Sequence, residues 1–125
     1  MARVLVIDDD GSVRSAICRI LEREGHETFE AASGSEAMAR FADTQPDLLI
    51  TDVYMPGGDG IESLIRILAD APETRIIVMS GGGWAGTADV LADADRLGAA
   101  ATLPKPFSVE DVQDTVRRVL AEAES

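Results

Sequence analysis

Residues 4–10 read VLVIDDD, four consecutive apolar residues followed directly by three aspartates. An unbroken apolar run of this length is typical of a strand that is buried on both faces of a parallel sheet. The same arrangement recurs at residues 47–52, DLLITD, where a second apolar run ends in Asp52. These two stretches predict inner strands of one sheet, each with carboxylates where the strand ends.

Outward from these stretches, short apolar runs alternate with helical patterns along the whole chain. The five predicted strands cover residues 4–7, 28–31, 48–50, 76–79 and 99–103. Ser33 with Glu36, and Ser108 with Asp111, have the spacing of capping boxes that begin helices. Strict alternation predicts an α/β, doubly wound fold. We expect a five-stranded parallel sheet of order 2-1-3-4-5 with five helices on its two faces, a flavodoxin-like arrangement.

Each predicted helix carries an apolar stripe that should face the sheet. The second helix presents Ala37, Met38 and Phe41, the third Ile61, Leu64, Ile65 and Leu68, the fourth Val90, Leu91, Ala94 and Leu97, and the fifth Val109, Val112, Val116, Val119 and Leu120. Cys18, beside the stripe of the first helix, is most simply a small packing residue. His26 follows Gly25 in a turn at the edge opposite the strand ends that carry the aspartates.

Composition restricts the classes of function. The 125 residues, with 11 Lys and Arg against 23 Asp and Glu, carry a formal net charge of −12. Such a chain is repelled by nucleic-acid backbones and anionic membranes, which argues against direct DNA or membrane binding. A single cysteine and the lack of any long apolar run favour a soluble, cytoplasmic protein. We expect one domain over residues 1–125, with no output domain in this chain.

Polar groups gather where the predicted strands end. Asp8, Asp9, Asp52, Ser80 and Lys105 all fall at the carboxyl edge of the sheet, where folds of this class bind ligands. Neighbouring carboxylates repel one another unless a cation relieves the repulsion, and Mg²⁺ prefers oxygen ligands of this kind. Asp10, in contrast, is most simply the residue that begins the first helix.

Such a site suits phosphoryl transfer. Three carboxylates, one Mg²⁺ and the Lys105 ammonium carry no net charge together, so a phosphoryl dianion could approach them. Asp52 ends a central strand and is the best candidate for the nucleophile. Ser80 could donate its hydroxyl to a phosphoryl oxygen.

The ordered set of motifs resembles the response-regulator receiver domain of two-component signalling, in its single-domain form similar to the chemotaxis regulators. The matching residues are VLVIDDD at 4–10, DLLITD at 47–52, Met55-Pro56, Asp59-Gly60, Ser80 and Lys105-Pro106-Phe107.

The resemblance implies a phosphorelay function. Asp52 would be phosphorylated from the phosphohistidine of a sensor histidine kinase or a phosphotransfer protein, and Ser80 and Lys105 would contact the phosphoryl group. Asp9, Asp52 and the backbone carbonyl of Tyr54 would bind Mg²⁺ directly, and Asp8 mainly through water. The Lys105–Pro106 bond would be cis. Such a protein is no enzyme beyond its own phosphorylation and dephosphorylation, and it would signal to a partner protein through the face formed by the fourth helix, fifth strand and fifth helix.

Two features depart from the family pattern. Thr102 stands where the family usually has an aromatic residue whose inward turn accompanies activation. The loop Gly81-Gly82-Gly83-Trp84 is also unusual, so coupling to the output face and the lifetime of the phosphoryl group do not follow from the resemblance.

Three alternatives compete with this interpretation. A pseudo-receiver would keep the fold as an interaction module without accepting phosphate. The segment Asp8-Asp9-Asp10-Gly11-Ser12 resembles the nucleophile loop of haloacid-dehalogenase-type phosphatases, with Asp8 as nucleophile and Asp10 as acid. An FMN carrier shares the fold but needs a neutral phosphate loop, which three aspartates argue against.

Overall fold

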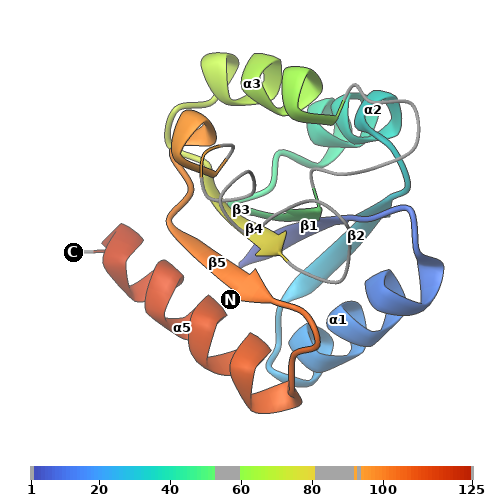
Figure 1. Cartoon of the computed structure of the whole chain (residues 1–125), viewed down its shortest axis with the longest axis vertical. Coiled ribbons are helices and arrows are strands. Elements are labelled where there is room, and N and C mark those ends of the chain that lie inside the picture. The colour runs from blue at the N-terminus through green and yellow to red at the C-terminus, as the bar shows by residue number, and fades with distance from the viewer. Residues whose placement is uncertain (1, 53–59, 81–91, 93, 125) are drawn as a thin grey trace.

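The computed structural model describes residues 2–52, 60–80, 92 and 94–124. Strands and helices alternate through these residues (Figure 1). Their bounds are β1 (Arg3–Ile7), α1 (Gly11–Arg23), β2 (Glu27–Ala31), α2 (Gly34–Thr44), β3 (Leu48–Asp52), α3 (Gly60–Asp70), β4 (Arg75–Ser80), β5 (Ala101–Pro104) and α5 (Val109–Glu124). Residues 92 and 94–97 are also helical, in the region of the fourth predicted helix.

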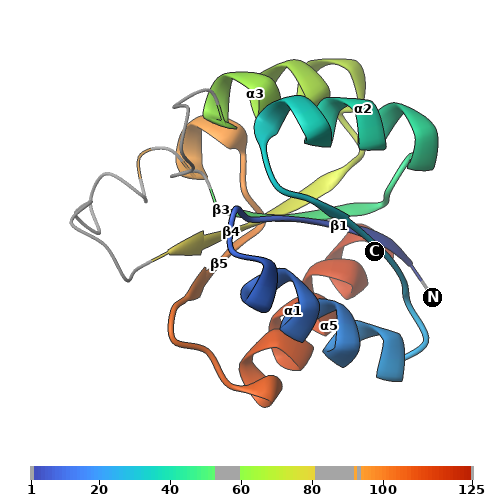
Figure 2. The same ribbon diagram turned by 90° about the vertical axis from the view of Figure 1, so that its right-hand side faces the viewer.

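The strands form one parallel sheet in the order β2-β1-β3-β4-β5, so the predicted fold class is confirmed. Figure 2 shows α2 and α3 on one face of the sheet, and α1 and α5 on the other. The chain leaves β1 toward β2 on one side and returns to β3 on the other. This places the switch point of the topology between the carboxyl ends of β1 and β3, where the two acidic motifs lie.

Both faces of the sheet are packed. Along β1, Val4 and Val6 belong to the cluster under α1 and α5, whereas Leu5 and Ile7 belong to the cluster under α2 and α3. All four are fully buried, which explains the unbroken apolar run of residues 4–7. β1 is therefore packed on both faces, and it positions the aspartates that follow it.

The helix starts behave as their sequences predict. The Asp10 carboxylate accepts the Ser12 N–H at 2.9 Å and caps α1. The Ser108 hydroxyl accepts the Asp111 N–H at 3.0 Å, and the Asp111 carboxylate accepts the Ser108 N–H at 2.9 Å. This reciprocal pair is a complete capping box, so α5 begins directly after the loop that carries Lys105.

Three predictions about helix faces are wrong. Met38, Ile65 and Val109 are 38%, 37% and 51% exposed, although each was expected in a buried stripe. Ile67, which was not expected there, is only 5% exposed. A turn of 100° per residue places Ile65 well away from Ile67, and the apolar residues of α3 are too many to define one face by pattern alone. Val109 is the first residue of α5, so no earlier turn of the helix lies beside its side chain.

Other boundaries differ little from expectation. β5 begins at residue 101, two residues later than predicted, β3 extends two residues past its apolar run to Asp52, and β4 extends one residue past its run to Ser80. Cys18 is buried, as expected for a packing residue. Within the described part of the chain, no helix has the length and apolar character needed to cross a membrane.

Candidate functional site

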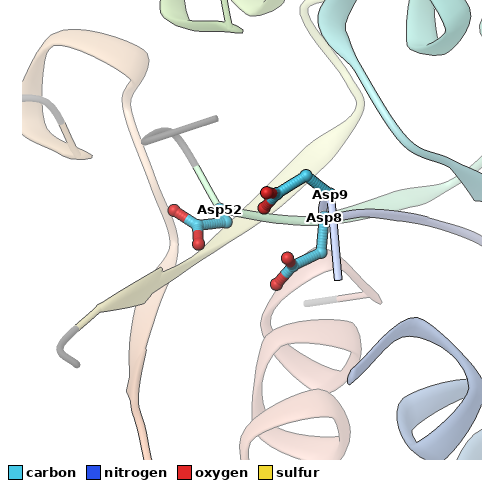
Figure 3. A group of neighbouring side chains, drawn as sticks. All are labelled: Asp8, Asp9 and Asp52. Carbon is cyan, nitrogen blue, oxygen red and sulfur yellow. The ribbon is translucent and has the colours of Figure 1, made fainter. Parts of the chain in front are cut away.

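An acidic cluster lies at the carboxyl edge of the sheet. Asp8 and Asp9 directly follow β1, and Asp52 is the last residue of the neighbouring strand β3. One carboxylate oxygen of each residue lies within 4.8 Å of the others. Figure 3 shows the Asp9 and Asp52 side chains next to each other, with Asp8 beside them. The predicted convergence of these three carboxylates is therefore present in the structure.

Asp8 is the buried member of the cluster, with 1% of its surface exposed. One of its oxygens, Oδ1, accepts the backbone N–H of Asp10 at 2.9 Å. The other, Oδ2, accepts the ammonium of Lys105 at 2.9 Å. A buried carboxylate is costly unless it is paired and hydrogen-bonded, and these two contacts meet that requirement.

Lys105 joins the acidic cluster from the far end of the chain. Its Nζ donates to Asp52 Oδ2 at 3.1 Å as well as to Asp8. Partial burial lowers the pKa of this ammonium, but its hydrogen bonds to Asp8 and Asp52 and their negative charges raise it by more. Lys105 therefore remains charged between two carboxylates. The peptide bond between Lys105 and Pro106 is cis, as the resemblance implies.

Asp9 is the exposed member of the cluster. Desolvation raises the pKa of its carboxyl group, and the hydrogen bond and charge of Asp8 and the charge of Asp52 raise it further. The charged form of Asp9 is thus disfavoured by desolvation and by the like charges that crowd it. A hard divalent ion with oxygen ligands and several waters would relieve this crowding, so the donor set fits Mg²⁺.

The remaining predicted residues are placed only in part. Ser80 ends β4 and pairs with Pro104, but its side chain lies outside the described residues. Thr102 is half-buried on β5, where it pairs with Val78. The other predicted positions lie outside the described residues altogether: Tyr54, Met55-Pro56, Asp59, Val90, Leu91, Gly81-Gly82-Gly83 and Trp84, along with the side chain of Ile61.

Arg14 reaches this site although sequence reasoning did not single it out. Its Nη1 donates to the backbone carbonyl of Asp8 at 2.6 Å. A signal for this contact exists, because helical side chains lean toward the N-terminus and Arg14 lies one turn after Asp10.

Comparison with known proteins identifies the class. A family model for the response regulator receiver domain matches residues 4–117. The chain therefore belongs to the receiver domain family, which confirms the resemblance seen in its motifs. Receiver domains are the signalling modules of two-component response regulators; they interact with histidine kinases or phosphotransfer proteins and typically bind Mg²⁺.

Individual relatives vary in length. Sporulation initiation phosphotransferase F of Bacillus subtilis is 32% identical over 118 residues, which cover 94% of this chain and 93% of that protein. The DNA-binding transcriptional regulator NtrC of Azospirillum brasilense is 40% identical over 119 residues, but these are 95% of this chain and only 24% of NtrC. A CheY-like receiver domain structure from Methanospirillum hungatei has a TM-score of 0.88 at 27% identity, covering 99% of this chain and 97% of that one.

Proposed function

We propose that this receiver domain accepts a phosphoryl group on Asp52 from the phosphohistidine of a sensor histidine kinase or phosphotransfer protein, in a Mg²⁺-dependent reaction. The observation that carries the proposal is the position of Lys105, whose ammonium bridges Asp8 and Asp52 within the acidic cluster. This geometry supports a site built to balance the charge of an incoming phosphoryl group.

The proposed transfer exchanges one bond for another. A carboxylate oxygen of Asp52 attacks phosphorus, the phosphorus–nitrogen bond breaks, and the imidazole nitrogen keeps the electron pair. Asp9, Asp52 and the Tyr54 carbonyl would hold Mg²⁺, with Asp8 acting through water. When bound, the ion supplies positive charge to the phosphoryl oxygens. Lys105 and the Ser80 hydroxyl would contact the same oxygens.

Exposure separates the candidate nucleophiles. The Asp52 side chain is 17% exposed and can be reached by a donor, whereas Asp8 is 1% exposed and both its oxygens have hydrogen-bond partners. A phosphatase of the haloacid-dehalogenase type would need Asp8 as nucleophile and Asp10 as acid, but Asp10 caps α1. The structure thus supports Asp52.

We also propose that the signal passes to a partner protein through the surface made by the helical residues 92 and 94–97, β5 and α5. Phosphorylation would shift this surface between two populated conformations. With Thr102 on β5, any such shift must proceed without an aromatic side chain at that position. The chain would act as a signalling module of one domain over residues 1–125, and not as a classical enzyme.

Intact-mass measurement after incubation with acetyl phosphate tests the proposal. Wild type should gain one phosphoryl group only when Mg²⁺ is present, and Asp52→Asn should gain none. Asp47→Asn is the matched control, because Asp47 precedes the same strand and accepts the Arg3 N–H at the opposite edge of the sheet. It should gain the group as wild type does.

Two other results would count against the reaction as tested with acetyl phosphate. No mass gain in any variant would favour the pseudo-receiver alternative or a strict requirement for a kinase. A gain that survives Asp52→Asn but disappears in Asp8→Asn would support the phosphatase alternative.

A further inference from the structure

We infer that Arg14 is a positioning residue for the acidic turn after β1: its guanidinium fixes the backbone of Asp8, and thereby the direction in which Asp9 enters the cluster. The inference rests on the proposed function, since it assigns Arg14 a part in binding the Mg²⁺ that phosphoryl transfer requires.

The guanidinium connects three elements. From α1, Arg14 donates through Nη1 to the Asp8 carbonyl at 2.6 Å and through Nε to the Glu30 carboxylate at 3.1 Å. Asp8 lies one residue beyond the end of β1, and Glu30 belongs to β2, where it pairs with Val6 of β1. The Arg14 side chain is 20% exposed. Arg14 therefore ties the turn to the neighbouring strand from a largely buried position.

The turn after β1 needs an added contact because the carboxylates of Asp8 and Asp9 repel each other. The Asp8 carboxylate is anchored by Lys105 and by the Asp10 N–H, whereas Asp9 is exposed and has a carboxylate oxygen within 4.8 Å of those of Asp8 and Asp52. The place of Asp9 thus depends on Asp8 and on the backbone that bears both side chains. That backbone is held where the Asp8 N–H donates to Ala31 and where the Asp8 carbonyl accepts from Arg14.

Arginine suits this position better than lysine does. Its planar group donates in two fixed directions at once, toward a carbonyl and toward a carboxylate, whereas an ammonium is a single compact charge. Groups that orient metal ligands in this way typically change metal affinity by about 10- to 100-fold when they are removed.

Calorimetric titration of the full chain with MgCl₂ tests the inference. Arg14→Met should raise the Mg²⁺ dissociation constant by about tenfold. Arg3→Met is the matched control, since Arg3, on β1, makes the same Nε-to-carboxylate pair with Glu27 of β2, but at the opposite edge of the sheet. Its dissociation constant should equal that of wild type. Arg14→Lys should recover part of the affinity, because an ammonium can still reach the carbonyl.

Thermal unfolding without Mg²⁺ separates positioning from general stability. Both Met variants lose one ion pair and should unfold at reduced temperatures, Arg14→Met at the lower one because it also loses the bond to the Asp8 carbonyl, but only Arg14→Met should lose Mg²⁺ affinity. A folded Arg14→Met that binds Mg²⁺ as wild type does would overturn the inference. Should that variant fail to fold, Glu30→Gln decides: it keeps the carbonyl contact but loses the ion pair that orients it, and unchanged affinity there would overturn the inference as well.

The wild-type titration separates the two proposals. If wild type binds Mg²⁺ and Arg14→Met binds it with the same affinity, only the role of Arg14 is overturned. No binding of Mg²⁺ by wild type would overturn the proposed function and the inference with it.

Discussion

His26 shows how a single ring can make the stability of this fold depend on pH. Its Nδ1 accepts the backbone N–H of Ala2 at 3.0 Å, which requires that nitrogen to carry no proton. Burial lowers the pKa of His26 in the folded chain, and the opposing charge of Glu24 does not outweigh it. The neutral ring therefore stabilises the fold fully above its unfolded pKa of about 6.5.

We expect this contribution to be lost as pH falls through the lowered pKa of the folded state. The free energy of unfolding of wild type should decrease from about pH 7.5 to about pH 5.5 more steeply than that of His26→Asn, whose amide oxygen can accept the same N–H without titrating. Urea denaturation at both pH values measures the difference. Equal slopes for the two proteins would show that His26 has no such role.

The residues at the ends of the strands could be predicted from the sequence. Asp8, Asp9, Asp52 and Lys105 could be placed together because parallel strands bring their carboxyl ends to one edge of the sheet. The contact of Arg14 with Glu30 could not be predicted, because it depends on how α1 crosses β2 and not on a local pattern. The side-chain place of Ser80 stays a prediction.

Among the elements, α3 was predicted as a helix with a partly correct inner face: Leu64 and Leu68 pack against the core as predicted, but Ile65 is exposed and Ile67 is buried. The spacing of its apolar residues is compatible with more than one stripe, and only packing against α2 and the sheet selects Leu64 and Ile67. Local sequence fixes where a helix begins and ends more firmly than which side it buries, because caps are local contacts whereas burial depends on distant elements.

The inner face of α3 can be checked with two alanine variants. Ile67→Ala removes a side chain that is 5% exposed and should lower the free energy of unfolding by about 2–5 kcal/mol. Ile65→Ala removes one that is 37% exposed and should cost less than about 1 kcal/mol. Chemical denaturation measures both, and a larger cost at Ile65 would contradict the assigned face.

The capping box of α5 makes a second prediction for an element. Ser108→Ala leaves the Asp111 N–H without its side-chain acceptor and should lower the free energy of unfolding by about 1 kcal/mol. Ser15→Ala, on the exposed surface of α1, is the control and should change it by less than about 0.5 kcal/mol. Similar costs at the two positions would mean that the box contributes nothing.

For the whole molecule, Mg²⁺ binding should be coupled to folding. An ion that binds only the folded chain stabilises it by about 2.7 kcal/mol at a concentration about 100 times its dissociation constant. We expect wild type to gain this stability, measured by urea denaturation with and without MgCl₂. EDTA should reverse the gain, because the ion is then removed from the carboxylates of the cluster.

Asp9→Asn should produce two effects of opposite sign. Without Mg²⁺ it should be more stable than wild type, because it removes one of three crowded negative charges. With Mg²⁺ it should gain little, because a direct ligand is lost. If Asp9→Asn gained as much stability from Mg²⁺ as wild type does, Asp9 would not be a ligand of the ion.

The contact between Lys105 and Asp8 joins residues 97 positions apart, and its contact with Asp52 spans 53 positions. A chain emerging from the ribosome therefore exposes both aspartates well before it holds the lysine that completes the site. We expect nascent chains and proteolytic fragments that lack β5 to be poor substrates for a kinase. Only a chain that has assembled the entire sheet would then be phosphorylated efficiently.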